Sequence, residues 1–322
     1  MDNGIFRKLL RGIEYVFAYQ KILRIIKKEQ YDHVHIQWLL MYKLDRIFLN
    51  KIKKLNSKIV FTAHNAVPHV EGEKFIDELR RIYDVVDIIL VHGQAIKDEL
   101  LLMFPELEQK IIIQPHGAVL NRKATMENYI IPADIFQKIQ DKELYIMFGN
   151  QFFNKGTDRL LKIWREEYTN DSKKMLIIAG RRTNSYPELE AELSQISSDG
   201  NVLVLTGYIE EELLDYLIQQ SEAILLPYRH ASMSGVIFTA AEYQRTVLTT
   251  RCGAICEYLE EGNDSIVVEN SDEAFSMGLK ELMSLSHEER LRRGKNLYTN
   301  INSKYSWDSI AALLVDRVYK IQ

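Results

Sequence analysis

Cysteine, proline and long apolar runs are scarce in this sequence. Its 322 residues include only six prolines and two cysteines, Cys252 and Cys256, with no further metal ligands at suitable spacing nearby. A disulfide framework and a zinc site are therefore excluded, and both cysteines are interpreted as reduced thiols. No uncharged apolar run of about 18 residues occurs, so we expect no membrane-spanning helix. Charges scattered through the first apolar positions argue against a signal peptide.

Charge is distributed unevenly, although the net charge is only −4. Residues 1–60 contain 13 Lys/Arg and 5 Asp/Glu, a balance of +8. Within them, apolar residues recur at helical spacing among basic ones, at Ile5, Leu9, Ile13, Val16 and Phe17. This pattern is typical of an amphipathic helix resting on an anionic membrane surface. The alternative is an ordinary packed helix with a solvated basic face. No nucleic-acid partner is expected.

Short apolar runs recur along the whole chain. They are continuous rather than alternating, as expected for strands buried on both faces of a parallel sheet. Helix-like stretches such as 73–86, 156–168 and 210–221 separate most of them, which predicts a doubly wound α/β architecture. The runs read HVHIQW, KIVFTAH, DIILVHG, KIIIQPHG, LYIMFG, KMLIIAG, NVLVLTG, AILLPY, TVLTT and SIVVE.

A polar, weakly periodic segment over 118–142 separates four strand candidates from six. We therefore predict two Rossmann-like domains facing a cleft: 1–130 on the acceptor side, 131–304 for the nucleotide, and a helix over 305–322 that crosses back. Because the chain opens on a helix, the first domain is either short or lacks its first strand–helix unit. Ligands of such sheets bind at the carboxyl ends of strands, where several unusual residues fall. These are His64, His92, His116, Gly149, Gly180, Gly207 and Arg229.

Several stretches, taken in order, resemble a known family. YDHVHIQW, KIVFTAHNAVPH, DIILVHG and IIIQPHG resemble the N-terminal half of bacterial glycosyltransferases of the GT-B fold. LYIMFGNQFFNKGTDRLL, LIIAGRR and VLVLTGYIEEELLDYLIQQSEAILLPYRHASMSGVIFTAAEYQ resemble the nucleotide-sugar half. YSWDSIAALLVDRVY is similar to the closing helix. The similarity is greatest to glycosyltransferase family 4 and its relatives in exopolysaccharide and capsule assembly.

The stretch SMSGVIFTAAEYQ is the strongest candidate for a phosphate site. A helix N-terminus offers backbone N–H donors and a favourable dipole to an anion, although Ser234 and Gly235 would also suit plain capping. Lys155 and Arg229 follow strands and could neutralise a departing diphosphate. The resemblance implies that the donor is a nucleotide-linked sugar, with further contacts at Gly149, Asn150, Gly180, Tyr208, Val236 and His116.

The resemblance also implies catalytic roles for His64, Lys155 and Glu242. The family signature is Glu-x7-Glu; Glu242 matches its second, ribose-binding position, but Ser234 stands at the first. This departure leaves the sugar and the stereochemistry open. His69 and Glu71 are candidates for the general base of an inverting reaction. No Asp-x-Asp pair lies between a strand and a turn, so neither a metal ion nor a cofactor is expected.

The sequence therefore predicts a metal-independent hexosyltransferase. It would use a UDP- or GDP-linked donor and a glycan acceptor, and lipid-linked surface polysaccharide is the expected product. We expect it in the cytoplasm, peripheral to the inner face of the cell membrane. A catalytically silent homologue that supports an active transferase is the alternative, and an epimerase on the same fold fits less well.

Overall fold

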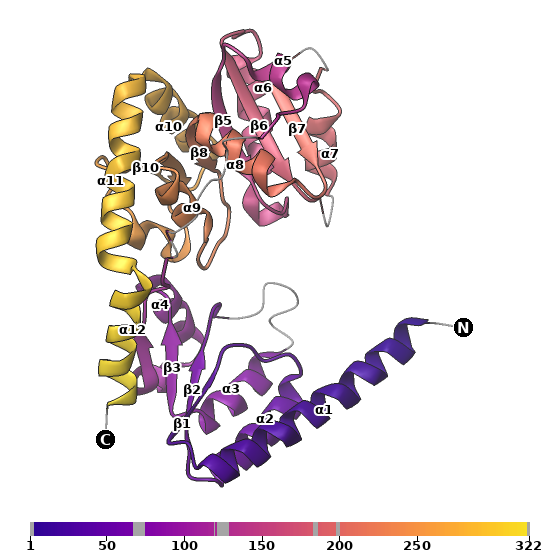
Figure 1. Ribbon diagram of the computed structural model, residues 1–322, viewed down its shortest axis with the longest axis vertical. Coiled ribbons are helices and arrows are strands. Elements are labelled where there is room, and N and C mark those ends of the chain that lie inside the picture. The colour runs from indigo at the N-terminus through magenta and orange to yellow at the C-terminus, as the bar shows by residue number, and fades with distance from the viewer. Residues whose placement is uncertain are drawn as a thin grey trace. The chain divides into compact units, whose positions relative to one another are not determined.

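The computed structural model describes residues 3–66, 75–118, 120, 129–182, 186–197 and 200–320, without the side chains of residues 3–9. The chain divides into two compact units (Figure 1). The first contains Met1–Pro115 and Ala312–Gln322, and the second contains His116–Ala311. The boundary thus lies at Pro115 rather than at residue 130. The returning segment begins at Ala312 rather than at residue 305.

The first unit is built on a parallel sheet of order β1-β2-β3-β4. Its core strands carry only apolar or small side chains at their centres, so both faces of the sheet can be buried. Residues Ile59, Val60, Ile89 and Leu90 are fully buried in it. The strands are β1 (His33–Ile36), β2 (Lys58–Thr62), β3 (Ile88–Val91) and β4 (Ile111–Ile113).

Helices connect these strands in sequence. Each has an apolar stripe that packs on the sheet or on a neighbouring helix; in α2 the stripe includes Phe48, Leu49 and Ile52. The elements are α1 (Asn3–Glu29), α2 (Tyr42–Lys53), α3 (Ile76–Val85), α4 (Gln94–Met103) and the 3₁₀ helix η2 (Pro105–Lys110).

Helix α1 lies along α2 and projects beyond it (Figure 1). The buried carboxylate of Asp45 anchors it, accepting hydrogen bonds from Tyr15 (2.5 Å) and Tyr19 (3.0 Å). The ring of Tyr19 also stacks on Phe48 at 4.2 Å. Burial raises the pKa of Tyr15 to about 12, so its phenol remains a hydrogen-bond donor over the physiological range.

The second unit contains a six-stranded parallel sheet of order β10-β9-β8-β5-β6-β7. The order reverses at β5, which lies between β8 and β6, so a crevice opens at the carboxyl ends there. The strands are β5 (Glu143–Phe148), β6 (Lys174–Gly180), β7 (Val202–Thr206), β8 (Ser221–Leu226), β9 (Thr246–Thr250) and β10 (Ser265–Val268).

The helices of the second unit alternate with these strands. They are α5 (Ala133–Ile139), η3 (Phe153–Lys155), α6 (Thr157–Tyr168), α7 (Pro187–Leu193), α8 (Glu211–Gln220), α9 (Val236–Glu242), η4 (Gly253–Tyr258), α10 (Asp272–Ser284) and α11 (His287–Tyr305). All ten predicted strands are present, four in one sheet and six in the other, so the predicted α/β class with two parallel sheets is confirmed.

The end of the chain is shared between the units. Helix α12 (Trp307–Leu314) begins in the second, where Gly117 packs so tightly on Trp307 that a Cβ there would approach its ring to 2.6 Å. A π-helical turn, η5 (Val315–Tyr319), then places Val318 in the apolar cluster of Val60 and Leu90 in the first unit. The residues that return to the first unit are therefore those after Ala311. Trp307 belongs to the second unit.

Candidate functional site

Two loops in the second unit meet beyond the carboxyl ends of β5 and β8. The backbone N–H of Arg229 donates to the carbonyl of Asn154 at 2.8 Å, and the Asn154 amide donates to the carbonyl of His230 at 3.0 Å. Glycine is required at position 156 for the two loops to approach this closely, because a Cβ there would lie 2.1 Å from the carbonyl oxygen of Pro227. These contacts fix Lys155 and the segment before α9 in one site.

Lys155 extends across this site. Its ammonium lies 3.9 Å from the ring centroid of Tyr228, a cation–π contact that holds the charge in place. Burial lowers the pKa of Lys155, and no ion pair with a carboxylate accompanies it among the described residues. A partly desolvated cation without a counter-charge is suited to receive an anion.

Arg229 has a different environment from Lys155. Its guanidinium forms two hydrogen bonds of 2.7 Å with the carboxylate of Asp158, a bidentate pair in which both side chains are largely buried. Burial opposes ionisation of Asp158, but hydrogen bonds from Arg229 and Tyr186 outweigh it and lower the pKa of that carboxyl. The charge of Arg229 is thus already balanced within the protein.

The segment before α9 does not have the predicted cap. Helix α9 begins at Val236 without a side-chain cap, and the buried hydroxyl of Ser234 instead lies 3.3 Å from that of Tyr228. The alternative interpretation, in which Ser234 only caps the helix, does not hold, because its hydroxyl is turned toward the aromatic ring that also holds Lys155.

Gly235 is exposed, and the fold does not require glycine there. Its φ of −63° is open to any residue, and a Cβ would meet nothing within 4 Å. Glycine therefore keeps space open beside the first turn of α9.

The other predicted nucleotide contacts line the ends of neighbouring strands. Gly149 has φ +109°, and a Cβ on Gly180 would lie 2.0 Å from the Gly149 carbonyl oxygen, so close approach of β5 and β6 requires glycine. Tyr208 follows β7 with 81% of its surface exposed, and Asn150 is exposed as well. Val236 opens α9, and the half-buried Glu242 is its last residue.

His116 is held within the second unit. Its backbone N–H donates to the hydroxyl of Tyr258 at 2.8 Å, and its ring lies against Phe238, with centroids 5.6 Å apart. Its Nδ1 lies 2.7 Å from the carbonyl oxygen of Gly117, which can only accept, so Nδ1 carries the hydrogen.

The first unit has a separate hollow at the carboxyl ends of its strands. It has a volume of about 340 Å³, and its wall includes Trp38, Tyr42, His64 and Asn65. The ring of His64 stacks on the indole of Trp38, with centroids 4.2 Å apart and planes 7° from parallel. His69 and Glu71, the predicted bases, lie outside the described residues.

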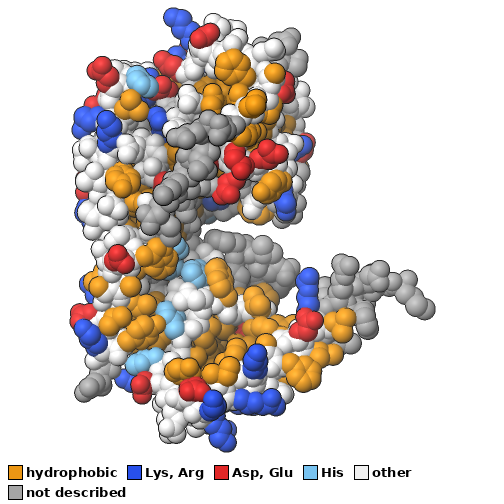
Figure 2. Space-filling model, viewed as in Figure 1, with side chains coloured by type: hydrophobic (Ala, Val, Ile, Leu, Met, Phe, Trp, Pro, Cys, Tyr) orange, Lys and Arg blue, Asp and Glu red, His pale blue; other side chains and the backbone are white. Residues whose placement is uncertain are grey.

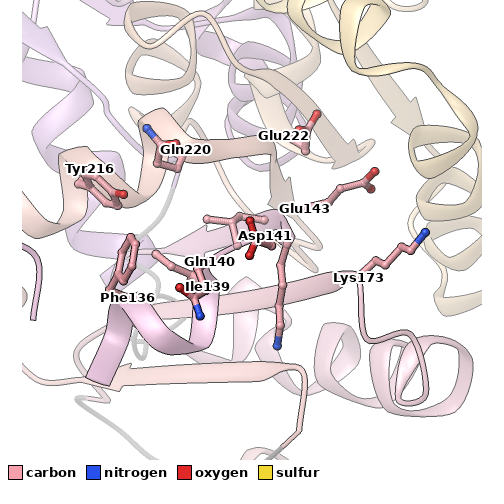
Figure 3. Close-up of a pocket in the computed structure, with 11 residues that line it drawn as sticks. Phe136, Ile139, Gln140, Asp141, Glu143, Lys173, Tyr216, Gln220 and Glu222 are labelled. Carbon is pink, nitrogen blue, oxygen red and sulfur yellow. The ribbon is translucent and has the colours of Figure 1, made fainter. Parts of the chain in front are cut away.

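A larger hollow, of about 600 Å³, opens in the second unit near the start of β5 and β8 (Figure 3). Its wall carries charges of both signs, including Asp141, Glu143 and Lys173. Glu222, also in this wall, is paired with Arg290 at 2.9 Å. The hollow lies at the opposite edge of the sheet from Lys155 and Gly235, so it is separate from the predicted nucleotide site.

The described part of the chain has neither a membrane-spanning helix nor a cluster of metal ligands. No helix there is long and apolar enough to cross a membrane. No three His, Cys, Asp or Glu side chains among these residues come together in a way that could hold a metal ion. That the protein needs no metal ion stays a prediction.

Three residues of these sites were not predicted from the sequence. Tyr228 links Lys155 to Ser234, Asp158 neutralises Arg229, and Trp38 supports His64. Trp38 and Tyr228 are the last residues of two predicted runs, HVHIQW and AILLPY, and lie two residues past the observed strands β1 and β8; this position was the available signal. Nothing in the sequence indicated which cation Asp158 would pair with.

Comparison with known proteins supports the resemblance seen in the sequence. Residues 142–284 match the family model described as Glycosyl transferases group 1. A curated relative, GDP-mannose:glycolipid 4-beta-D-mannosyltransferase of Xanthomonas campestris pv. campestris, is 22% identical over 240 residues. The alignment covers 68% of this chain and 61% of the relative, so the chain spans about 61% of the length of the curated relatives it matches.

Solved structures extend the likeness to the whole chain. A UDP-forming alpha,alpha-trehalose-phosphate synthase from Burkholderia vietnamiensis has a TM-score of 0.75 at 12% identity and covers 100% of this chain and 81% of its own. HepE of Anabaena, in complex with UDP, has a TM-score of 0.72 at 12% identity, with coverages of 94% and 82%. The fold and the resemblance to GT-B glycosyltransferases are thereby confirmed.

Proposed function

We propose that this protein is a glycosyltransferase that moves a hexose from a nucleoside-diphosphate sugar to a glycan acceptor. The site formed by Lys155, Tyr228, Ser234 and Gly235 supports this proposal, because it joins a cation without a described counter-charge to a helix start left open by glycine. The family match over 142–284 includes all four residues.

The acceptor is proposed to be a lipid-linked glycan of the bacterial surface. The Xanthomonas relative is a glycolipid mannosyltransferase by name, which supports such an acceptor and a GDP-linked donor. HepE was solved with UDP, so UDP is the second nucleotide to test. The site residues supply charge neutralisation and positioning, and no metal is included in this proposal.

Binding of GDP and UDP, measured by calorimetric titration, tests the nucleotide site. We expect Gly235→Val to abolish binding of whichever nucleotide binds, because the side chain occupies the space beside α9. Its melting temperature should stay close to wild type, since a Cβ meets nothing within 4 Å. Gly235→Ala is the smaller matched control and should weaken binding less. Unchanged affinity in Gly235→Val would disprove the phosphate site.

Release of nucleoside diphosphate separates an enzyme from a silent homologue. An active transferase should release it from GDP-mannose or UDP-glucose faster when a glycolipid acceptor is added. A silent homologue would bind the nucleotide without releasing it from the sugar.

Helix α1 is proposed to rest on an anionic membrane. Its outward stripe, at spacings of three and four residues, begins with exposed Leu10, Ile13 and Phe17 and continues with Lys21, Arg24 and Lys28. The opposite face holds Tyr15 and Tyr19, which are bonded to Asp45. Apolar and basic side chains are both visible along α1 in Figure 2. An anchored helix with an apolar and basic outer face suits insertion among acidic lipid headgroups.

A further inference from the structure

Two helices of the second unit present the same pair of side chains to the hollow near the start of β5 and β8. Helix α5 and its C-cap contribute Phe136 and Gln140, and helix α8 contributes Tyr216 and Gln220. In both pairs the residues are four positions apart, which places them on one face of a helix. The backbone N–H of Gln140 donates to the carbonyl of Phe136 at 2.9 Å, so the helical spacing continues to Gln140. An aromatic ring and an amide therefore line the hollow from each helix.

These side chains are not used to hold the fold together. The amides of Gln140 and Gln220 are exposed, and neither forms a hydrogen bond with another described residue. Phe136 leaves 44% of its surface exposed, although phenylalanine is commonly buried. Both amides and the phenyl ring are therefore available to a ligand.

Carboxylates form the other side of the hollow (Figure 3). The guanidinium of the buried Arg290 lies 2.9 Å from Glu222 and 3.7 Å from Glu143. Nδ1 of His287 lies 2.8 Å from Glu222, and the hydroxyl of Tyr145 donates to Glu143 at 3.1 Å. Arg290, His287 and Tyr145 do not line the hollow, so they hold the two carboxylates from outside it. The result is a pair of oriented hydrogen-bond acceptors.

The wall as a whole is close to electrically neutral. Lys142 and Lys173 offset two of its three carboxylates, and Arg290 behind the wall offsets the third. A site for a diphosphate or another strongly charged ligand would have an excess of one sign. The balance of charge therefore favours an uncharged polar ligand.

A sugar ring suits these surroundings. Each hydroxyl group both donates and accepts, so it can bond to an amide and a carboxylate together. The C–H face of the ring can pack on an aromatic side chain, and the volume of about 600 Å³ is within the range of about 300–1,000 Å³ typical of small-molecule sites. In Figure 3 the rings of Phe136 and Tyr216 lie on one side of the hollow and Glu143 and Glu222 on the other. A ligand between them would contact both kinds of surface.

We infer that this hollow binds a pyranose ring of an uncharged saccharide, as a second site separate from the nucleotide site. Phe136 and Tyr216 pack on the C–H faces of the sugar, and Gln140 and Gln220 bond to its hydroxyl groups. The inference does not rest on the proposed function, because it uses only the lining of the hollow. Since Lys155 lies at the opposite edge of the sheet, nucleotide and saccharide can bind together.

Saturation-transfer difference NMR of the whole protein tests this site, with maltose, cellobiose and mannobiose as probes. We expect transfer to at least one of these disaccharides. Gln220→Ala should raise its Kd about 3- to 10-fold, the loss expected for one neutral hydrogen bond. Gln219→Ala is the matched control, because Gln219 is the exposed neighbour on α8 and does not line the hollow. Gln140→Ala and Gln137→Ala form a second pair of test and control at α5.

Further arms distinguish a saccharide site from other binding. Phe136→Ser should weaken the disaccharide more than either glutamine variant, because it removes a larger contact surface. Saturating GDP or UDP should leave the disaccharide bound, and its displacement would place the sugar in the nucleotide site instead. Stronger transfer to adenosine than to the disaccharides would assign the aromatic rings to a flat base. Either result, transfer to none of the disaccharides, or equal losses in test and control variants would overturn the inference. If the protein binds no nucleotide, the proposed function fails, and the disaccharide result still decides this site.

Discussion

Burial of a lysine costs free energy that an anionic ligand can restore. Because burial lowers the pKa of Lys155 below its ordinary 10.5, the charged form destabilises the folded protein at neutral pH, and this cost disappears as the pH rises above that value. A bound diphosphate stabilises the ammonium of Lys155 and so raises its pKa again. Affinity for nucleotide and protonation of Lys155 are therefore linked.

We predict that affinity for the nucleoside diphosphate falls as the pH rises toward 10.5, as Lys155 loses its proton. Lys155→Met should weaken binding about 10- to 100-fold at pH 7, equivalent to a charged hydrogen bond of about 1.5–3 kcal/mol, and should remove the alkaline decline. Calorimetric titration between pH 7 and 10 measures both effects.

Two neighbouring groups of Lys155 require a control in that titration. Burial raises the pKa of Tyr228 to about 12, outside the measured range, and it also raises the pKa of the Cys252 thiol above its ordinary 9.0. Because Cys252 is a titratable neighbour of Lys155, Cys252→Ser is the control and should keep the alkaline decline. If Lys155→Met keeps the decline as well, Lys155 is not the group that titrates.

Lys155 and Arg229 also show the limit of sequence reasoning at this scale. Both were predicted as cations for the diphosphate because each follows a strand. Asp158 is the second residue of α6, where a carboxylate suits any helix start, so its bond to Arg229 could not be predicted from its position. Pairing between residues 71 positions apart depends on the folded loops, whereas the strand ends themselves were readable from apolar runs.

The helices and strands were the part of this structure that the sequence predicted best. Continuous apolar runs specify buried parallel strands strongly, since each run must be covered on both faces. The start of α9 was predicted less well, because Ser234 and Gly235 both suit a helix cap and the sequence could not show that Tyr228 competes for the serine hydroxyl. Helix α1 was predicted with two alternatives, and the structure contains features of each: an anchored face and an exposed apolar stripe.

For α1 we predict salt-sensitive binding to vesicles that contain an acidic phospholipid. Replacing Lys21, Arg24 and Lys28 with serine should reduce binding about 100-fold at low salt, since each basic residue near the surface contributes about 1 kcal/mol. Phe17→Ser should also reduce it, because the exposed ring is the largest apolar group of the stripe. Co-sedimentation with anionic and neutral vesicles measures this.

Matched controls for α1 are available in the second unit. Serine at exposed Lys138, Lys162 and Lys173 changes the net charge equally, and Met277→Ser removes an exposed apolar side chain elsewhere. These variants should bind vesicles as the unaltered protein does. Equal losses in test and control variants would indicate attraction by net charge alone and would rule out a docking role for α1.

At the scale of the whole molecule, the two units are joined at two places in the chain. The chain leaves the first unit after Pro115 and re-enters it at Ala312. The last described residues thus belong to the first unit, although the rest of that unit ends at Pro115, almost 200 positions earlier in the chain. Val318 is fully buried against Val60 and Leu90, and the hydroxyl of Tyr319 lies 2.7 Å from Nδ1 of His35.

We predict that a chain ending at Ala311 loses stability in the first unit only. Removing Val318 exposes an apolar site worth about 1.5–3 kcal/mol, and loss of the Tyr319 contact adds about 1 kcal/mol. In calorimetric melting, the transition of the first unit should move to lower temperature. The transition that GDP or UDP raises should stay in place, because Lys155, Tyr228 and Gly235 lie wholly within the second unit. A chain ending at Lys320 should melt as the full chain does, and Val318→Ser gives a milder test if the shortened protein is insoluble. A loss of nucleotide binding in the shortened chain would show that the second unit depends on the returning segment for its own folding.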